Sequence, residues 1–188
     1  MDVNKLYSIL LSDRPREELL KNEEELFQLI PELRVCKGFN QNNEWHIYDV
    51  YEHILHVVDL VPCNLVLRLT ALFHDIGKPN CYKEDSKGVG HFYGHWDESI
   101  RIFNNFSDKY GIDSNICNLV SNLIYYHDIN IDKLDDDGMR KLYETFDISG
   151  IKMLYQIKKA DLLSQNSKYH YILDSYDEQS KKVLLKYK

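Results

Sequence analysis

The sequence has no long apolar run and no basic leader. No stretch approaches the roughly 20 consecutive apolar residues that a membrane-spanning helix needs, and the short apolar run at residues 6–11 follows Asp2 and Lys5 rather than a basic cluster. A secretory signal normally combines such a cluster with a longer apolar stretch. We therefore expect a protein that does not enter a membrane and that resides in the cytoplasm.

Closely spaced cysteines are also missing. No Cys-x-x-Cys pair occurs among the four cysteines, which are Cys36, Cys63, Cys81 and Cys117. A zinc ribbon or a dithiol redox motif is therefore not expected. The chain is long enough to bury a core without cross-links, and the wide spacing predicts reduced thiols.

Basic charge is scarce as well. Lysine and arginine number 23 against 30 aspartates and glutamates, which gives a formal net charge of −7. A surface that binds nucleic acid regardless of sequence needs an excess of basic residues to neutralise phosphates. The charge therefore does not indicate an RNA partner, although a local basic groove is compatible with it. No motif specifies a protein partner.

Helical periodicity is what the chain has in abundance. Its 188 residues fit one domain, and no stretch keeps the apolar–polar alternation of a half-buried strand for long. We predict an all-α, single-domain helical bundle over residues 1–188, with a loop at residues 80–94. The expected helices cover residues 15–30, 50–61, 65–76, 97–110, 113–127, 136–146, 148–164 and 173–186.

The most informative residues are His74 and Asp75, which end the apolar segment 65–76. An imidazole and a carboxylate buried there without partners would cost several kcal/mol. A cation is the simplest partner for both. Gly77 and Pro79 follow directly and end the helix, with the glycine available for a left-handed cap.

Two further residues complete a candidate metal site. His53 lies one predicted helix upstream, and the break at Pro62 would fold that helix back so that its imidazole lies beside His74. Asp161 is the only carboxylate in a partly apolar helical stretch. Two imidazoles and two carboxylates form a mixed nitrogen and oxygen site, which suits Mn, Fe, Co, Ni, Zn or Mg.

The order His … His-Asp … Asp resembles the HD-domain superfamily of metal-dependent phosphohydrolases. The similarity is closest to the HD region of bacterial CCA-adding tRNA nucleotidyltransferases and covers residues 35–165. It rests on the segments Gly38-Phe-Asn-Gln-Asn-Asn, Tyr48-Asp-Val-Tyr-Glu-His-Ile-Leu, Leu72-Phe-His-Asp-Ile-Gly-Lys-Pro and Gly88-Val-Gly-His-Phe-Tyr-Gly-His. No Gly-Ser motif with paired aspartates precedes them, so CCA addition is not expected.

The resemblance implies two further metal ligands, His95 and His127, and therefore one or two divalent ions, bridged by Asp75 when two are bound. Bound ions lower the pKa of a water toward neutrality and clamp the attacking and leaving oxygens of a phosphoryl group. Lys78 is expected to neutralise a phosphate oxygen, so Asp75 and Lys78 are the predicted catalytic residues. Lys78, His91 and Arg101 are the candidates for substrate binding, although His91 could equally make a hydrogen bond within its loop.

Other histidines have plainer interpretations. In the HD family the first ligand directly follows an acidic residue, which selects His53 and leaves His56 on the surface or behind a ligand. His46 and His170 are expected to be structural. Asp128 could orient His127 or be a surface charge at a helix end.

An acidic segment at residues 133–144 has part of the spacing of a calcium-binding EF-hand loop. Lys133 stands where the first carboxylate of such a loop must be. We therefore reject a calcium site and interpret Asp135 or Asp136 as a helix cap.

The sequence thus predicts an enzyme that cleaves a phosphomonoester or a 2′,3′-cyclic phosphodiester, of a nucleotide, by metal-bound hydroxide. The cyclic diester follows from the resemblance alone. A nucleoside-triphosphate or dinucleotide hydrolase is the alternative enzyme. A non-catalytic, metal-containing module that binds a nucleotide or RNA is the alternative from another class. The complete ligand set argues against that module, because nothing forces a purely structural domain to keep every inner position.

Overall fold

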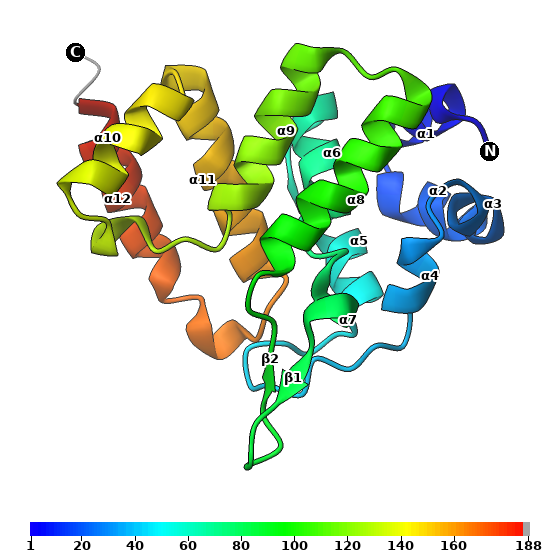
Figure 1. Ribbon diagram of the computed structural model, residues 1–188, viewed down its shortest axis with the longest axis horizontal. Helices are drawn as coiled ribbons and strands as arrows, with labels where there is room; N and C mark the ends of the chain where they lie inside the picture. Colours follow the sequence, from blue (N-terminus) through cyan, green and yellow to red (C-terminus); the bar gives the residue numbers. More distant parts are fainter. Residues whose placement is uncertain (186–188) are drawn as a thin grey trace.

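Helices form nearly all of the regular structure in the computed structural model, which describes residues 1–185 (Figure 1). The predicted all-α helical bundle is confirmed. One end consists of α1 (Val3–Leu10), α2 (Pro15–Lys21), α3 (Glu23–Leu29) and α4 (Glu32–Cys36). The centre consists of α5 (Val50–Leu60), α6 (Leu65–Phe73), α7 (Lys78–Cys81), α8 (His95–Tyr110) and α9 (Ser114–Tyr126). The other end consists of α10 (Asp136–Thr145), α11 (Ile148–Leu163) and α12 (Ile172–Leu185).

Side-chain caps fix where several of these helices begin. The carboxylate of Asp49 accepts a hydrogen bond from the backbone N–H of Glu52 at 2.7 Å, and α5 starts one residue after Asp49. Asp135 accepts one from the N–H of Gly138 at 2.8 Å and caps α10. Such caps satisfy backbone donors that a helix start leaves free. Asp135 therefore has the capping role predicted when the calcium loop was rejected.

Some boundaries differ from the sequence-based expectation. The helix predicted for residues 15–30 is broken into α2 and α3 at Asn22, where φ of −110° and ψ of 23° depart from helical values and the side chain donates to the carbonyl of Glu18 at 2.8 Å. The loop predicted for residues 80–94 contains the end of α7 and a short antiparallel hairpin. Its strands are β1 (Lys83–Glu84) and β2 (Gly90–His91), with Lys83 opposite His91. Lys186 of the predicted last helix lies outside the described residues.

Two apolar clusters form the core. One lies among the helices from α1 to α9, and the other joins α9, α10, α11 and α12. Between them α11 packs against α5, α6 and α9. Within residues 1–185, no helix is long and apolar enough to cross a membrane.

Gly77 lets the turn before α7 lie directly against the start of α8. Its φ of −79° is not left-handed, so the cap expected from the sequence is not formed. A Cβ atom at this position would instead lie 2.6 Å from the backbone oxygen of His95 and 2.7 Å from the backbone nitrogen of Ser99. Only glycine fits there without displacing α8. The contact brings the turn that carries Asp75 against the start of α8.

Candidate metal centre

The predicted metal ligands come together from five helices. His53 lies in α5, His74 caps the C-terminus of α6, and Asp75 follows in the next turn. His95 is the first residue of α8, His127 caps the C-terminus of α9, and Asp161 lies in α11. The four imidazoles and Asp75 are buried, and this group could hold a divalent metal ion.

Asp75 lies between two pairs of imidazoles. Its Oδ2 is 3.2 Å from Nε2 of His53 and 3.3 Å from Nε2 of His74. Its Oδ1 is 3.3 Å from Nε2 of His95 and 3.6 Å from Nε2 of His127. Each carboxylate oxygen therefore faces one pair. Asp161 adds a second carboxylate to the first pair, with Oδ1 at 3.0 Å from Nε2 of His53.

Hydrogen bonds at the far side of each ring fix the tautomers. The Nδ1 atoms of His74, His95 and His127 face the backbone carbonyls of Ala71, Phe92 and Ile124 at 2.8, 2.9 and 2.6 Å. Because a carbonyl only accepts hydrogen bonds, each Nδ1 carries the proton. Each Nε2 therefore presents a lone pair to the centre.

His53 reaches the same tautomer through a side chain. The hydroxyl of Ser164 donates to the backbone oxygen of Asp161 at 2.8 Å, so its oxygen accepts the Nδ1–H of His53 at 2.7 Å. Such outer hydrogen bonds orient metal-binding imidazoles and raise their basicity.

The resulting donor set fits a cation. The Nε2 atoms of His53 and His74 are 3.3 Å apart, and those of His95 and His127 are 3.4 Å apart, so lone pairs face each other. Oδ1 of Asp75 is buried and has no hydrogen-bond donor within residues 1–185. Neighbouring lone pairs and an orphaned buried carboxylate oxygen are costly unless a positive charge lies among them.

Electrostatics keep the two carboxylates ionised. Burial works to raise the pKa of Asp75, but neighbouring His74 and Lys78 outweigh it and hold that pKa well below its ordinary value. Burial is likewise outweighed at Asp161, where the adjacent imidazole of His53 lowers the pKa. At His53 burial lowers the pKa, and the adjacent carboxylates of Asp161 and Asp75 more than offset it, so the pKa is raised. Negative charge is thus concentrated at the centre.

Lys78 is a buried cation in direct contact with this centre. Its Nζ lies 2.6 Å from Oδ2 of Asp75 and 2.8 Å from Oε1 of Gln41. His46 places Nε2 at 3.4 Å from the same ammonium group, and the ring of Phe92 lies under it at 5.3 Å. Lys78 is therefore held in one position beside the bridging carboxylate.

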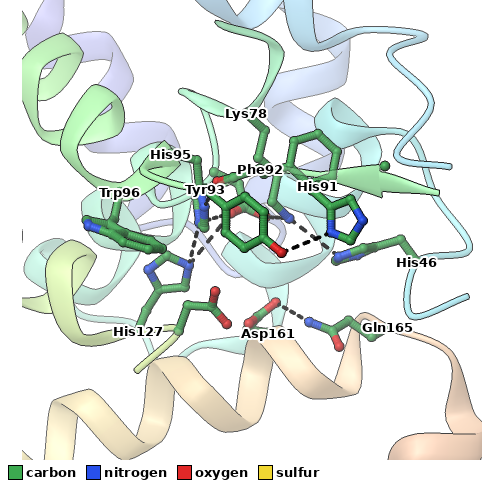
Figure 2. A pocket seen from close by; sticks show the side chains of 13 residues that line it. His46, Lys78, His91, Phe92, Tyr93, His95, Trp96, His127, Asp161 and Gln165 are labelled. Carbon is green, nitrogen blue, oxygen red and sulfur yellow. Dashed lines mark hydrogen bonds and ion pairs between the residues drawn. The ribbon is translucent and has the colours of Figure 1, made fainter. Parts of the chain in front are cut away.

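A cavity of about 200 Å³ opens onto the centre (Figure 2). Its lining includes Asp75, Lys78, His95, His127 and Asp161, together with His46, Gly90, His91, Phe92, Tyr93, Trp96, Asp128 and Gln165. Both aromatic and charged groups thus face the space where a small ligand would meet the metal ligands.

The two remaining substrate-binding candidates have different positions. His91 lines the cavity, with Nε2 at 3.2 Å from the carboxylate of Asp85 and its ring stacked on Tyr93. Arg101 does not line the cavity and is exposed, with its guanidinium bound to Glu98 at 2.7 Å. At 100° per residue, Arg101 lies about 120° around α8 from His95, so it faces away.

Several residues of the site were not selected from the sequence. His46, which was expected to be structural, lines the cavity and is stacked edge-on against His53. Burial lowers the pKa of His46 to about 2, so its ring is neutral. Gln41 fixes Lys78. Both belong to the segment that follows Gly38, where clustered Asn and Gln residues were the available signal. His56, by contrast, stacks on Tyr48 outside the cavity lining.

Ser164→Ala is expected to weaken metal binding about 10- to 100-fold, the usual cost of removing an outer hydrogen-bond partner. The substitution leaves Nδ1 of His53 without its acceptor and releases the tautomer that directs the lone pair of Nε2 inward. Competition against a chromophoric chelator measures the dissociation constant. Ser107→Ala, at a buried serine of α8 away from the cavity, is the matched control. Equal affinity in the wild type and Ser164→Ala would contradict the prediction.

Comparison with known proteins identifies neither a family nor a function for this chain. The sequence matches no protein-family model and no curated protein. The relationship to the HD-domain superfamily therefore stays a prediction, and the function has to be inferred from the geometry of the centre.

Proposed function

We propose that this protein is a metal-dependent phosphohydrolase. The observation that carries the proposal is the position of Asp75, whose two oxygens each face a separate pair of imidazole Nε2 atoms. A carboxylate shared in this way suits two divalent ions held side by side. Asp161 would add a carboxylate to an ion held by His53 and His74.

The donor types limit the ion. Four imidazoles and two carboxylates suit Mn, Fe, Co, Ni, Zn or Mg, and the absence of a thiolate among the expected ligands disfavours metals that select sulfur. Ions bound there would lower the pKa of a coordinated water and stabilise the oxygens of a phosphoryl group.

The other groups of the cavity suit a phosphorylated substrate. Lys78 is positioned to neutralise a phosphoryl oxygen next to Asp75. His91 lies in the cavity wall, where the carboxylate of Asp85 holds its Nε2. The rings of Phe92 and Trp96 line the same space. A volume of about 200 Å³ is below the roughly 300–1,000 Å³ of sites that enclose a whole organic ligand. The cavity therefore matches the phosphoryl end of a substrate.

We infer that the substrate is a phosphomonoester or a 2′,3′-cyclic phosphodiester of a nucleotide. Either would place one phosphorus atom in the cavity. The test begins with protein stripped of metal by a chelator and loaded separately with each of the six ions. Each form is then given p-nitrophenyl phosphate, mononucleotides, 2′,3′-cyclic nucleotides and nucleoside triphosphates.

We expect hydrolysis of monoesters or cyclic diesters only by the loaded forms, and elemental analysis should find the ion in stoichiometric amounts. Protein that retains no ion, or that cleaves none of the esters when loaded, would overturn the proposal. Cleavage confined to triphosphates would assign the alternative hydrolase reaction to the same centre.

A further inference from the structure

A second cavity of about 520 Å³ adjoins the metal centre. It lies among α11, α12 and the segment before α5, and it shares part of its wall with the first cavity through His127, Asp128 and Asp161. Its volume falls within the range of pockets that enclose small organic ligands. A molecule with its phosphoryl group at the metal centre could extend into this space.

Two residues of its wall each have a buried polar atom with no hydrogen-bond partner within residues 1–185, Nδ1 of His46 and Oε1 of Gln179. Gln179 is 6% exposed and lines the cavity. Its Nε2 donates to the carboxylate of Asp132 at 2.5 Å and to the hydroxyl of Ser175 at 2.8 Å. Because a carboxylate accepts only from the NH₂ group, this contact fixes which way the amide is turned. Oε1 is buried and receives no hydrogen bond within residues 1–185.

The side-chain amide of Gln165 is oriented like that of Gln179, with its NH₂ group donating to a carboxylate. Its Nε2 donates to Oδ1 of Asp161 at 3.0 Å, and the residue lines both cavities (Figure 2). The carbonyl end of the amide is thus turned away from Asp161. Two amides of this wall are therefore oriented as acceptors, and a bound molecule has to supply the donors.

The charges of the wall disfavour an anionic ligand. Asp128, Asp132 and Asp161 all line the cavity, and Lys158 is the only lysine or arginine that lines it within residues 1–185. The ammonium group of Lys158 is engaged by the backbone oxygens of His127 and Ile129 at 2.7 and 2.9 Å. A polyphosphate would be repelled here, whereas an uncharged group rich in N–H donors would not.

Aromatic rings complete the wall. Tyr176 of α12 lines the cavity, and so does Trp45. The ring of Trp45 is stacked on Tyr169 with centroids 3.5 Å apart and planes 15° apart, which holds it in place. Planar heterocycles stack well on such rings.

We propose that the second cavity binds the base of the nucleotide substrate and prefers bases with an exocyclic amino group, which donates to Oε1 of Gln179. This inference rests on the proposed phosphohydrolase function for the placement of the phosphoryl group. Adenine and cytosine have such an amino group, and hypoxanthine and uracil have a carbonyl oxygen in its place. That oxygen would face Oε1 as a second acceptor.

The test compares matched pairs that differ in the exocyclic group of the base. Hydrolysis of 2′,3′-cyclic CMP and 2′,3′-cyclic UMP by metal-loaded protein gives kcat/KM for each, and calorimetry on metal-free protein gives the dissociation constants of the uncharged nucleosides adenosine and inosine. We expect the amino-bearing member to be preferred about 10- to 100-fold in the wild type. Gln179→Met should reduce that preference to within about twofold. Asp132, which loses its partner in this variant, is exposed and can be solvated.

Gln28→Met, on the exposed side of α3, is the matched control and should keep the wild-type preference. The inference would be overturned if the wild type showed equal kcat/KM values and equal dissociation constants for the two members of each pair. A preference that survives in Gln179→Met would also overturn it. Hydrolysis of p-nitrophenyl phosphate reports on the metal centre without a base. If this ester and the nucleotides are all inert, the proposed function fails, and the adenosine and inosine affinities still decide what the cavity binds. The wild-type comparison needs no variant, so it decides even if Gln179→Met does not fold.

Discussion

Asp75→Asn is expected to remove bound metal and phosphohydrolase turnover together. The amide keeps the shape of the carboxylate but loses its charge, and one of its two ends becomes a donor that cannot coordinate a cation. Both imidazole pairs lose their shared ligand. We expect a loss of metal affinity greater than the 100-fold that an outer-partner mutation can cost. Elemental analysis and phosphate release measure the two effects on one preparation.

The control for this variant is Asp59→Asn, an exposed carboxylate in α5 outside the cavity. Circular dichroism should accompany both, because Lys78 loses its buried carboxylate partner in Asp75→Asn, and breaking a buried ion pair can cost about 3–5 kcal/mol. The double variant His74→Ala, Asp75→Ala provides the decisive negative result. Turnover that persists in it would mean that the reaction takes place elsewhere on the molecule.

Lys78→Met should have the opposite signature, with metal retained and turnover lost. The ammonium group is not among the expected metal ligands, and under the proposed function it would lie beside the phosphoryl oxygen on which negative charge develops. Removal of one electrostatic stabiliser of this kind typically lowers kcat by about 10²- to 10³-fold. Steady-state kinetics with p-nitrophenyl phosphate, on protein whose metal content has been measured, separates kcat from KM.

Lys83→Met, on the exposed strand β1, is the matched control because it removes the same charge a few residues away. If Lys78→Met loses its metal as well, the role of Lys78 is to hold the carboxylate of Asp75 in place for the metal rather than to contact the substrate. If its kcat equals that of the control, the catalytic role assigned to Lys78 is wrong.

Helix boundaries were predictable where a single capping residue marks the start of a helix. Asp49, Asn64 and Asp135 each cap a helix at its N-terminus, and the helices begin directly after them. The break at Asn22 was not predictable, because neither proline nor glycine marks it. The backbone angles of Asn22 depart from those of a helix although its N–H still donates to the carbonyl of Glu18.

The centre was predictable in the part that breaks helical patterning. His74 and Asp75 were selected because polar groups end an apolar helix, and the structure brings them beside His53 and Asp161. His95 and His127 were suggested only by family resemblance, and the structure places them on the other side of Asp75.

What sequence alone could not supply was the wall around those ligands. Gln41 and His46 lie in an irregular segment with no periodicity, so nothing in their spacing shows which way they face. Arg101 was suggested by its sequence distance from His95, but the rotation of α8 turns it toward Glu98. Gln179 lies about a hundred residues from the His-Asp pair, and only the packing of α12 brings it near the centre.

The span of the ligands along the chain has a consequence for how the molecule comes apart. Residues 53 to 161 must all be folded for the six side chains to meet, so an unfolded chain has no preformed site for an ion. Ions bound at the centre would therefore connect α5, α6, α8, α9 and α11 in the folded state only. An ion present at 100 times its dissociation constant adds about 2.7 kcal/mol to the free energy of unfolding. The metal-free and the metal-bound protein would then differ in their free energy of unfolding by an amount that depends on the concentration of free metal.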